Sequence, residues 1–188
     1  MMSGHDCDAQ LTLSTARVGL LAEAIRSGIV ESIHQGVAVA LDADERMTAS
    51  VGDVDTRVYP RSSLKPFQAA AMVEHGLVLP DRLLALAAAS HSGERIHLDG
   101  VLEILSMHGF GADDLQNTPA RPFGAAARAA ARLAGVAPSP LQQNCSGKHA
   151  AMLATCVVNG WSTSDYLDTG HPLQQAIVAS MDLSLIHI

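Results

Sequence analysis

Ser62 and Lys65 stand three residues apart in a stretch, Arg61–Gln68, that is predicted to open a helix. On the first turn of a helix this spacing puts both side chains on one face, so the hydroxyl and the amine can come within hydrogen-bonding reach. The chain has ten arginines but only two lysines, Lys65 and Lys148. Because a desolvated amine can lose its proton and a guanidinium cannot, this usage favours a chemical role for the lysines. The pair is a candidate nucleophile and base; the alternative is a capping serine followed by a surface lysine.

A second polar cluster occupies a break between two helical patterns and reads Ser90-His91-Ser92-Gly93-Glu94. Polar residues at such a break can be presented to a cleft by the rigid elements on either side. The simpler interpretation is a helix C-cap in which Gly93 supplies the turn. The residues alone leave both interpretations open.

A third cluster reads Asn144-Cys145-Ser146-Gly147-Lys148-His149 and contains a thiol, an amine and an imidazole at a glycine-containing turn. It could form a reactive thiol site, a soft-metal site or an anion cradle at a helix N-terminus. One cysteine does not meet a standard zinc pattern, and a buried structural cysteine is the alternative. Cys156, on the apolar face of the following helical pattern, is predicted to be structural.

Strand patterns precede helical patterns along the chain. Short segments rich in valine and isoleucine, separated by glycine and turn residues, predict strands near residues 20–26, 29–35, 37–41 and 47–51. Apolar periodicity then predicts helices near 62–76, 80–89, 98–107, 125–134, 150–159 and 172–181, the first with Ser62 as N-cap and the fifth ending at Gly160. The expected class is α+β, with a loose leader over 1–17, one domain over 18–183 and a short tail over 184–188.

Composition narrows the classes of partner. The net charge is −7, with 48% hydrophobic and 16% charged residues, which is typical of a soluble globular protein. The acidic balance argues against a nucleic-acid or membrane-surface partner. The chain shows neither an apolar run of membrane-spanning length nor a signal-peptide pattern. Three cysteines fit a reducing compartment, so we expect a cytoplasmic protein.

Five segments in this order resemble the bacterial asparaginase II family of the thermolabile, Rhizobium type. The resemblance runs from about Val18 to about Gln175, and the Asn-Cys-Ser-Gly-Lys-His run is its most specific part. The segments are Ile29-Val30-Glu31-Ser32 with Gly36, Arg61-Ser62-Ser63-Leu64-Lys65-Pro66, Ala89-Ser90-His91-Ser92-Gly93-Glu94, Asn144 to Ala150 with Met152-Leu153, and His171-Pro172-Leu173-Gln174.

The resemblance implies an amidohydrolase that acts on a linear amide, L-asparagine, and releases aspartate and ammonia. It also implies a fold similar to glutaminases and serine β-lactamases. In the family Ser62 with Lys65 would form one serine–lysine tandem, and Ser90 would belong to a second.

The resemblance further implies a zinc ion, a homodimer and a set of binding residues. Cys145 and Lys148 match zinc-binding positions, and Arg61 and His149 match positions near the substrate. The family's chains run past the end of this one, and the lysine partner of Ser90 and a further cysteine ligand lie in that part. We therefore expect a truncated asparaginase whose domain is incomplete, with residues 184–188 not native.

Two other interpretations stay open at this stage. Ser-x-x-Lys at a helix start is also the signature of penicillin-recognising serine hydrolases, although the Asn-Cys-Ser-Gly-Lys-His run favours an asparaginase. The chain could also be a fragment without catalysis. Nothing in the residue spacing decides which of Ser62 and Ser90 attacks the amide, or whether asparagine or glutamine is preferred.

Overall fold

A computed structural model describes residues 17–185. The predicted leader, apart from residue 17, and residues 186–188 of the predicted tail lie outside the described residues. The chain divides into two compact units, Met1–Tyr59 and Pro60–Ile188, which we treat separately. The single domain expected over residues 18–183 stays a prediction.

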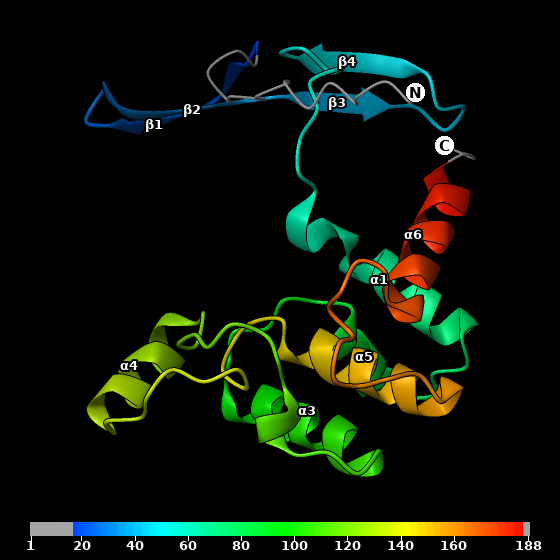
Figure 1. Ribbon diagram of the computed structural model, residues 1–188. Coiled ribbons are helices and arrows are strands. Elements are labelled where there is room, and N and C mark those ends of the chain that lie inside the picture. Colours follow the sequence, from blue (N-terminus) through cyan, green and yellow to red (C-terminus); the bar gives the residue numbers. More distant parts are fainter. Residues whose placement is uncertain (1–16, 186–188) are drawn as a thin grey trace, which may run out of the picture. The chain divides into compact units, whose positions relative to one another are not determined.

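The described part of the first unit consists of two β-hairpins, and it confirms the predicted strands. The strands are β1 (Gly19–Arg26), β2 (Ile29–Gly36), β3 (Ala38–Leu41) and β4 (Met47–Val51). β1 pairs antiparallel with β2, and β3 pairs antiparallel with β4 (Figure 1). Each hairpin is a separate two-stranded sheet.

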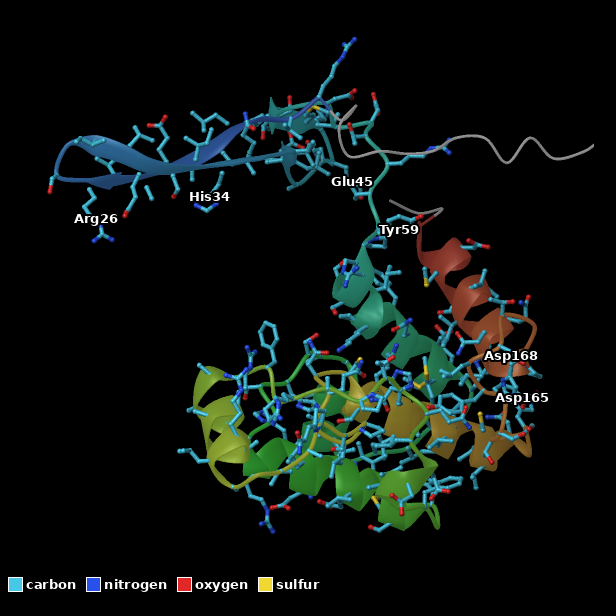
Figure 2. All side chains as sticks on the ribbon, turned by 60° about the vertical axis from the view of Figure 1, so that its left-hand side comes forward. Arg26, His34, Glu45, Tyr59, Asp165 and Asp168 are labelled. Atoms are coloured by element: carbon cyan, nitrogen blue, oxygen red, sulfur yellow. The ribbon has the colours of Figure 1, made fainter. Side chains whose placement is uncertain are left out.

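Neither hairpin contributes to a buried core. None of the side chains in residues 17–59 is buried. Figure 2 shows side chains such as Arg26 and His34 standing out from the β1–β2 hairpin. Because no side chain here is buried, these hairpins gain little stability from apolar burial. A two-stranded sheet alone is only marginally stable in water.

The second unit is helical, and it completes the mixed α+β class that the sequence predicts. Its relation to glutaminases and β-lactamases stays a prediction. In chain order the elements are the 3-10 helix η2 (Arg61–Leu64), α1 (Lys65–Glu74), α2 (Asp81–Ala87), α3 (Arg95–Met107), the 3-10 helix η3 (Ala112–Asp114), α4 (Ala125–Leu133), α5 (Ser146–Asn159) and α6 (Pro172–Leu185).

Helix α5 forms the centre of this unit. Residues 149–156 are buried without interruption, so the helix is covered on all sides rather than along one stripe. It packs against α1, α2, α3 and α6, and Figure 1 shows it between α1 and α3. Cys156 is fully buried, as predicted, and its burial raises the thiol pKa to about 11. The helix stops before Gly160, also as predicted.

Three helix starts differ from the sequence prediction; one of them is α3, which begins at Arg95 rather than near residue 98. Ser62 makes no side-chain cap; the 3-10 turn satisfies the backbone there, and the neighbouring Ser63 hydroxyl donates to Pro60 O at 2.6 Å. α1 therefore begins at Lys65. α5 begins at Ser146 rather than near residue 150. The supposed turn of the third cluster is thus the first turn of a helix.

Truncation of the buried core on α3 should destabilise this unit. Leu105 is fully buried, whereas Leu102 on the same helix is 39% exposed. We expect Leu105→Ala to lower the free energy of unfolding by about 2–5 kcal/mol, because it removes buried methyl groups and leaves a cavity. Leu102→Ala is the matched control and should cost about 1 kcal/mol or less. Urea unfolding of both variants checks this; equal losses would contradict the assignment of the core.

Candidate active site

Lys65, the first residue of α1, brings the three sequence clusters together. Its side chain is 3% exposed. Its Nζ lies 2.9 Å from Ser90 Oγ, 3.1 Å from Ala89 O and 3.2 Å from Asn144 O. The partners come from the segment after α2 and the segment before α5. The amine thus joins three parts of the chain that are far apart in sequence.

The burial of Lys65 makes its charged form less favourable than it is in water. Burial lowers the pKa of Lys65, the nearby Lys148 lowers it further, and Cys145 opposes the shift. Carbonyl oxygens only accept hydrogen bonds, so a neutral amine would give its two N–H groups to the carbonyls of Ala89 and Asn144. Its lone pair then faces the Ser90 hydroxyl. Ser90 itself is an exposed residue.

Ser62 and Arg61 lie on the surface of η2. Within the described residues the Ser62 side chain makes no hydrogen bond, and Lys65 bonds to Ser90 instead. The buried amine finds its acceptors in the interior, whereas Ser62 remains exposed. The spacing argument therefore finds the lysine but not its hydrogen-bonded serine. Arg61 is also exposed and has a φ of 49°, in the left-handed region that residues with a side chain rarely adopt.

The segment that carries Ser90 is fixed by two close approaches. Gly93 has a φ of 78°, and a Cβ there would lie 2.9 Å from Pro122 Cβ. A Cβ on Gly147, in the first turn of α5, would lie 2.8 Å from the carbonyl oxygen of Leu86 in α2. Gly93 is not the cap of α2, because that helix ends at Ala87, six residues earlier. The C-cap interpretation is therefore wrong.

His149 presents a neutral imidazole. It is 7% exposed, and burial lowers its pKa to about 3, with Lys148 and Lys65 adding to the shift. Nδ1 lies 3.1 Å from Tyr166 Oη, which accepts from the backbone N–H of Gln116 at 3.3 Å. The tyrosine hydroxyl is thus free to donate to Nδ1, and in that arrangement the ring proton sits on Nε2. Within the described residues Nε2 has no partner, so it can donate to a bound molecule.

Cys145 and Lys148 flank the start of α5 and are both half-buried. The Cys145 thiol donates to Gln143 Oε1 at 2.9 Å, and Asn117 Nδ2 donates to the same oxygen at 2.7 Å. Burial lowers the pKa of Lys148. A structural zinc site needs four ligands, and the described residues contain no cluster of three His, Cys, Asp or Glu side chains. Cys145 and Lys148 alone do not make up such a site.

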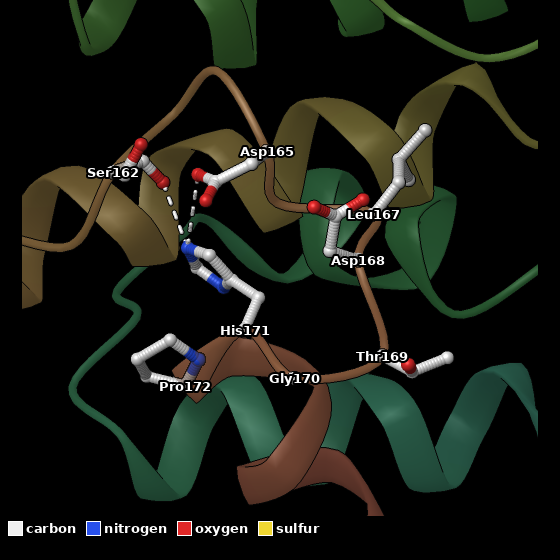
Figure 3. A pocket seen from close by; sticks show the side chains of 8 residues that line it. All are labelled: Ser162, Asp165, Leu167, Asp168, Thr169, Gly170, His171 and Pro172. Carbon is white, nitrogen blue, oxygen red and sulfur yellow. Dashed lines mark hydrogen bonds and ion pairs between the residues drawn. The ribbon is translucent and has the colours of Figure 1, made fainter.

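Of two cavities in the helical unit, only one is lined by residues of the candidate site. A cavity of about 330 Å³ lies beside α2 and α3 and is lined in part by Ser90 and His91. A larger one of about 760 Å³ lies on the loop that leads into α6 (Figure 3). There His171 is held by Ser162 O at 2.9 Å, and none of the predicted site residues contributes. The smaller cavity is the one that adjoins the serine–lysine pair.

Sequence reasoning missed three groups that build the site. Asn144 acts through its carbonyl oxygen, which no side-chain motif can reveal. Tyr166 lies far along the chain with no motif around it. His91 stood inside a motif, but nothing in the spacing linked its ring to Ser146. Its Nε2 lies 2.9 Å from the Ser146 hydroxyl.

A serine hydroxyl beside a desolvated amine is the pair of groups that a hydrolase with a serine nucleophile and a lysine base would need. The model of the L-asparaginase II family matches residues 22–185. The chain therefore belongs to the L-asparaginase II family, whose members are amidohydrolases acting on asparagine. A comparison with curated proteins gave no match. Among the described helices, none is long and apolar enough to cross a membrane.

The buried neutral state of His91 should make stability depend on pH. The ring is 4% exposed, and burial, His97 and Lys65 lower its pKa from 6.5 to about 4. Between these values the unfolded chain binds a proton that the folded chain does not, so stability is lost as the pH falls below 6.5. In urea unfolding, the contribution of His91 to the free energy of unfolding should be about 2 kcal/mol smaller at pH 5 than at pH 7. His91→Gln should reduce the pH-dependent loss by that amount; an unchanged loss would contradict the assignment.

Proposed function

We propose that this protein hydrolyses the side-chain amide of L-asparagine, with Ser90 as the nucleophile and Lys65 as the general base. The observation that carries the proposal is the 2.9 Å hydrogen bond between Ser90 Oγ and Lys65 Nζ. Membership of the L-asparaginase II family supports asparagine as the substrate. The family membership also favours this reaction over that of a penicillin-recognising hydrolase.

The reaction follows from the two groups in turn. As Ser90 Oγ attacks the amide carbon, its proton passes to the lone pair of Lys65 Nζ. The resulting ammonium donates that proton to the amide nitrogen, the C–N bond breaks, and ammonia leaves. An aspartyl ester remains on Ser90. A water molecule then attacks the ester carbon, and Lys65 takes a proton from that water. Lys65 returns the proton to Ser90 Oγ as the ester bond breaks, and aspartate is released.

Arg61 and His149 are suited to hold the substrate. A guanidinium can bind a carboxylate through two parallel hydrogen bonds, and Arg61 is exposed and unpaired within the described residues. The unpartnered Nε2–H of His149 can donate to a substrate oxygen. Because its pKa is depressed to about 3, the ring stays a neutral donor at neutral pH. It would not compete with Lys65 for the proton.

The remaining expectations from the resemblance stay predictions. Zinc would use Cys145 and Lys148 together with ligands that the described residues do not supply, and no step of the reaction above passes through it. Formation of a homodimer and a cytoplasmic location are likewise predictions. Whether this chain turns over substrate is decided by the assay below.

Replacement of Ser90 or Lys65 should abolish turnover. We expect Ser90→Ala and Lys65→Met each to lower kcat for L-asparagine by about a thousandfold or more, because they remove the nucleophile and its base. Ser63→Ala, which removes a surface hydroxyl from η2, is the control and should leave kcat unchanged. Release of ammonia measures the rates.

Ser62→Ala separates the two serines, because the resemblance pairs Lys65 with Ser62. If Ser90 is the nucleophile, the Ser62→Ala variant still forms the aspartyl ester from L-asparagine, and the Ser90→Ala variant does not. A Ser90→Ala variant with near-normal kcat, beside an inactive Ser62→Ala variant, would refute Ser90 and assign the nucleophile to Ser62. No ammonia release from the unmodified chain would mean that it is not a catalyst by itself.

The pH dependence of turnover should report the lowered pKa of Lys65. A lysine acts as a base only when it is neutral, so activity is lost as the pH falls through the folded pKa of Lys65. That pKa lies below 10.5, mainly because the side chain is buried. We expect kcat/KM to rise with pH along a limb whose midpoint lies below 10.5. A limb centred at or above 10.5 would exclude Lys65 as the base.

A further inference from the structure

His91 carries a fully paired ring that the reaction above does not use. It is 4% exposed. Its Nδ1 accepts from the Gly93 backbone N–H at 3.1 Å. An amide N–H can only donate, so Nδ1 is unprotonated and the neutral ring carries its proton on Nε2. Nε2 then donates to Ser146 Oγ at 2.9 Å, and Ser146 donates to Leu141 O at 2.8 Å. The donors and acceptors thus form one chain from the Ser90 segment to Ser146, the first residue of α5, and on to Leu141 O in the segment before it.

The backbone of the same residue reaches an acceptor of the catalytic amine. His91 N–H donates to Asn144 O at 3.1 Å, and this carbonyl also accepts from Lys65 Nζ at 3.2 Å. Ala89 O and Ser90 Oγ are the other two hydrogen-bond partners of Lys65 Nζ. Three consecutive residues are thus tied either to Lys65 or to the carbonyl that orients it.

We propose that His91 is a positioning residue: through Ser146 its ring fixes the segment before α5, and so holds Asn144 O and Ser90 Oγ in register around Lys65. The inference rests on the proposed function, because it assigns a role in the alignment of that nucleophile and base. Only the Nε2–H tautomer serves, since the other tautomer would set two donors, Nδ1–H and the Gly93 N–H, against each other.

Other contacts hold the Ser90 segment in place without the ring. Gly124 N–H donates to Ser92 O at 2.7 Å, and Gly93 lies tightly against Pro122. Loss of the ring therefore leaves the segment attached but removes its link to Ser146. We expect a loss of alignment at Lys65, seen as a lower kcat, in addition to the cost of leaving a buried hydroxyl without its donor.

Two substitutions separate the ring's donor from its acceptor. The amide nitrogen of glutamine can occupy the place of Nε2, whereas asparagine reaches only to the place of Nδ1. We expect His91→Gln to keep kcat for L-asparagine within about threefold, and His91→Asn to lower it by about tenfold or more at an unchanged KM. His108→Asn is the matched control, because His108 is half-buried and its Nδ1 is hydrogen-bonded to the Ile104 carbonyl of α3, away from the site residues.

Equal losses in both His91 variants, or a His91→Asn variant that only melts at a lower temperature, would overturn the proposal. Should His91→Asn fail to fold, Ser146→Ala removes the same hydrogen bond and must give the same loss of kcat. Nitrogen-15 NMR of the unmodified protein gives a readout independent of activity: a protonated Nδ1 on His91 would overturn the proposal. A fully active Ser90→Ala variant would instead refute the proposed function.

Discussion

The site depends on one constraint, the need of a buried lysine amine for oxygen partners. Lys65 meets it with two backbone carbonyls and one serine hydroxyl, taken from segments 24 to 79 residues away. Because carbonyls cannot donate, they fix how the amine is turned, and the remaining direction points at Ser90. The same burial that requires these partners lowers the pKa of Lys65. In the proposed reaction, the positioning and the activation of the base therefore have a single physical cause.

The elements around Lys65 are arranged so that this cluster cannot spread apart. α5 is buried along most of its length, and its first turn lies directly against α2 because Gly147 has no side chain to hold them apart. The Ser90 segment is thereby brought against the start of α5. A polar network through His91 and Ser146 completes the contact, with each donor facing an acceptor. Such complete pairing is what makes a buried polar cluster compatible with a stable core.

Much of this arrangement could be predicted from residue patterns, and the rest depends on tertiary contacts. Strand and helix positions follow from local periodicity and turn residues, so the strands and most helices were predictable. The scarcity of lysine singled out Lys65, and the motifs singled out Ser90 and Cys145. The partner of Lys65 was not predictable, because the helical spacing argument considers only neighbours along the chain. Asn144 stands inside a motif but acts through its backbone carbonyl, which no side-chain pattern reveals, and Tyr166 acts from a position that carries no motif.

In the proposed mechanism Ser90 Oγ, held by Lys65, attacks the amide carbon. An asparagine analogue with a diazoketone in place of the side-chain amide would alkylate the attacking oxygen and leave a permanent mark. Peptide mass spectrometry of the labelled protein then identifies the residue directly. We expect the label on Ser90, and we expect it to be lost when Lys65 is replaced by methionine. Label on Ser62 with Ser90 unmodified would contradict this mechanism.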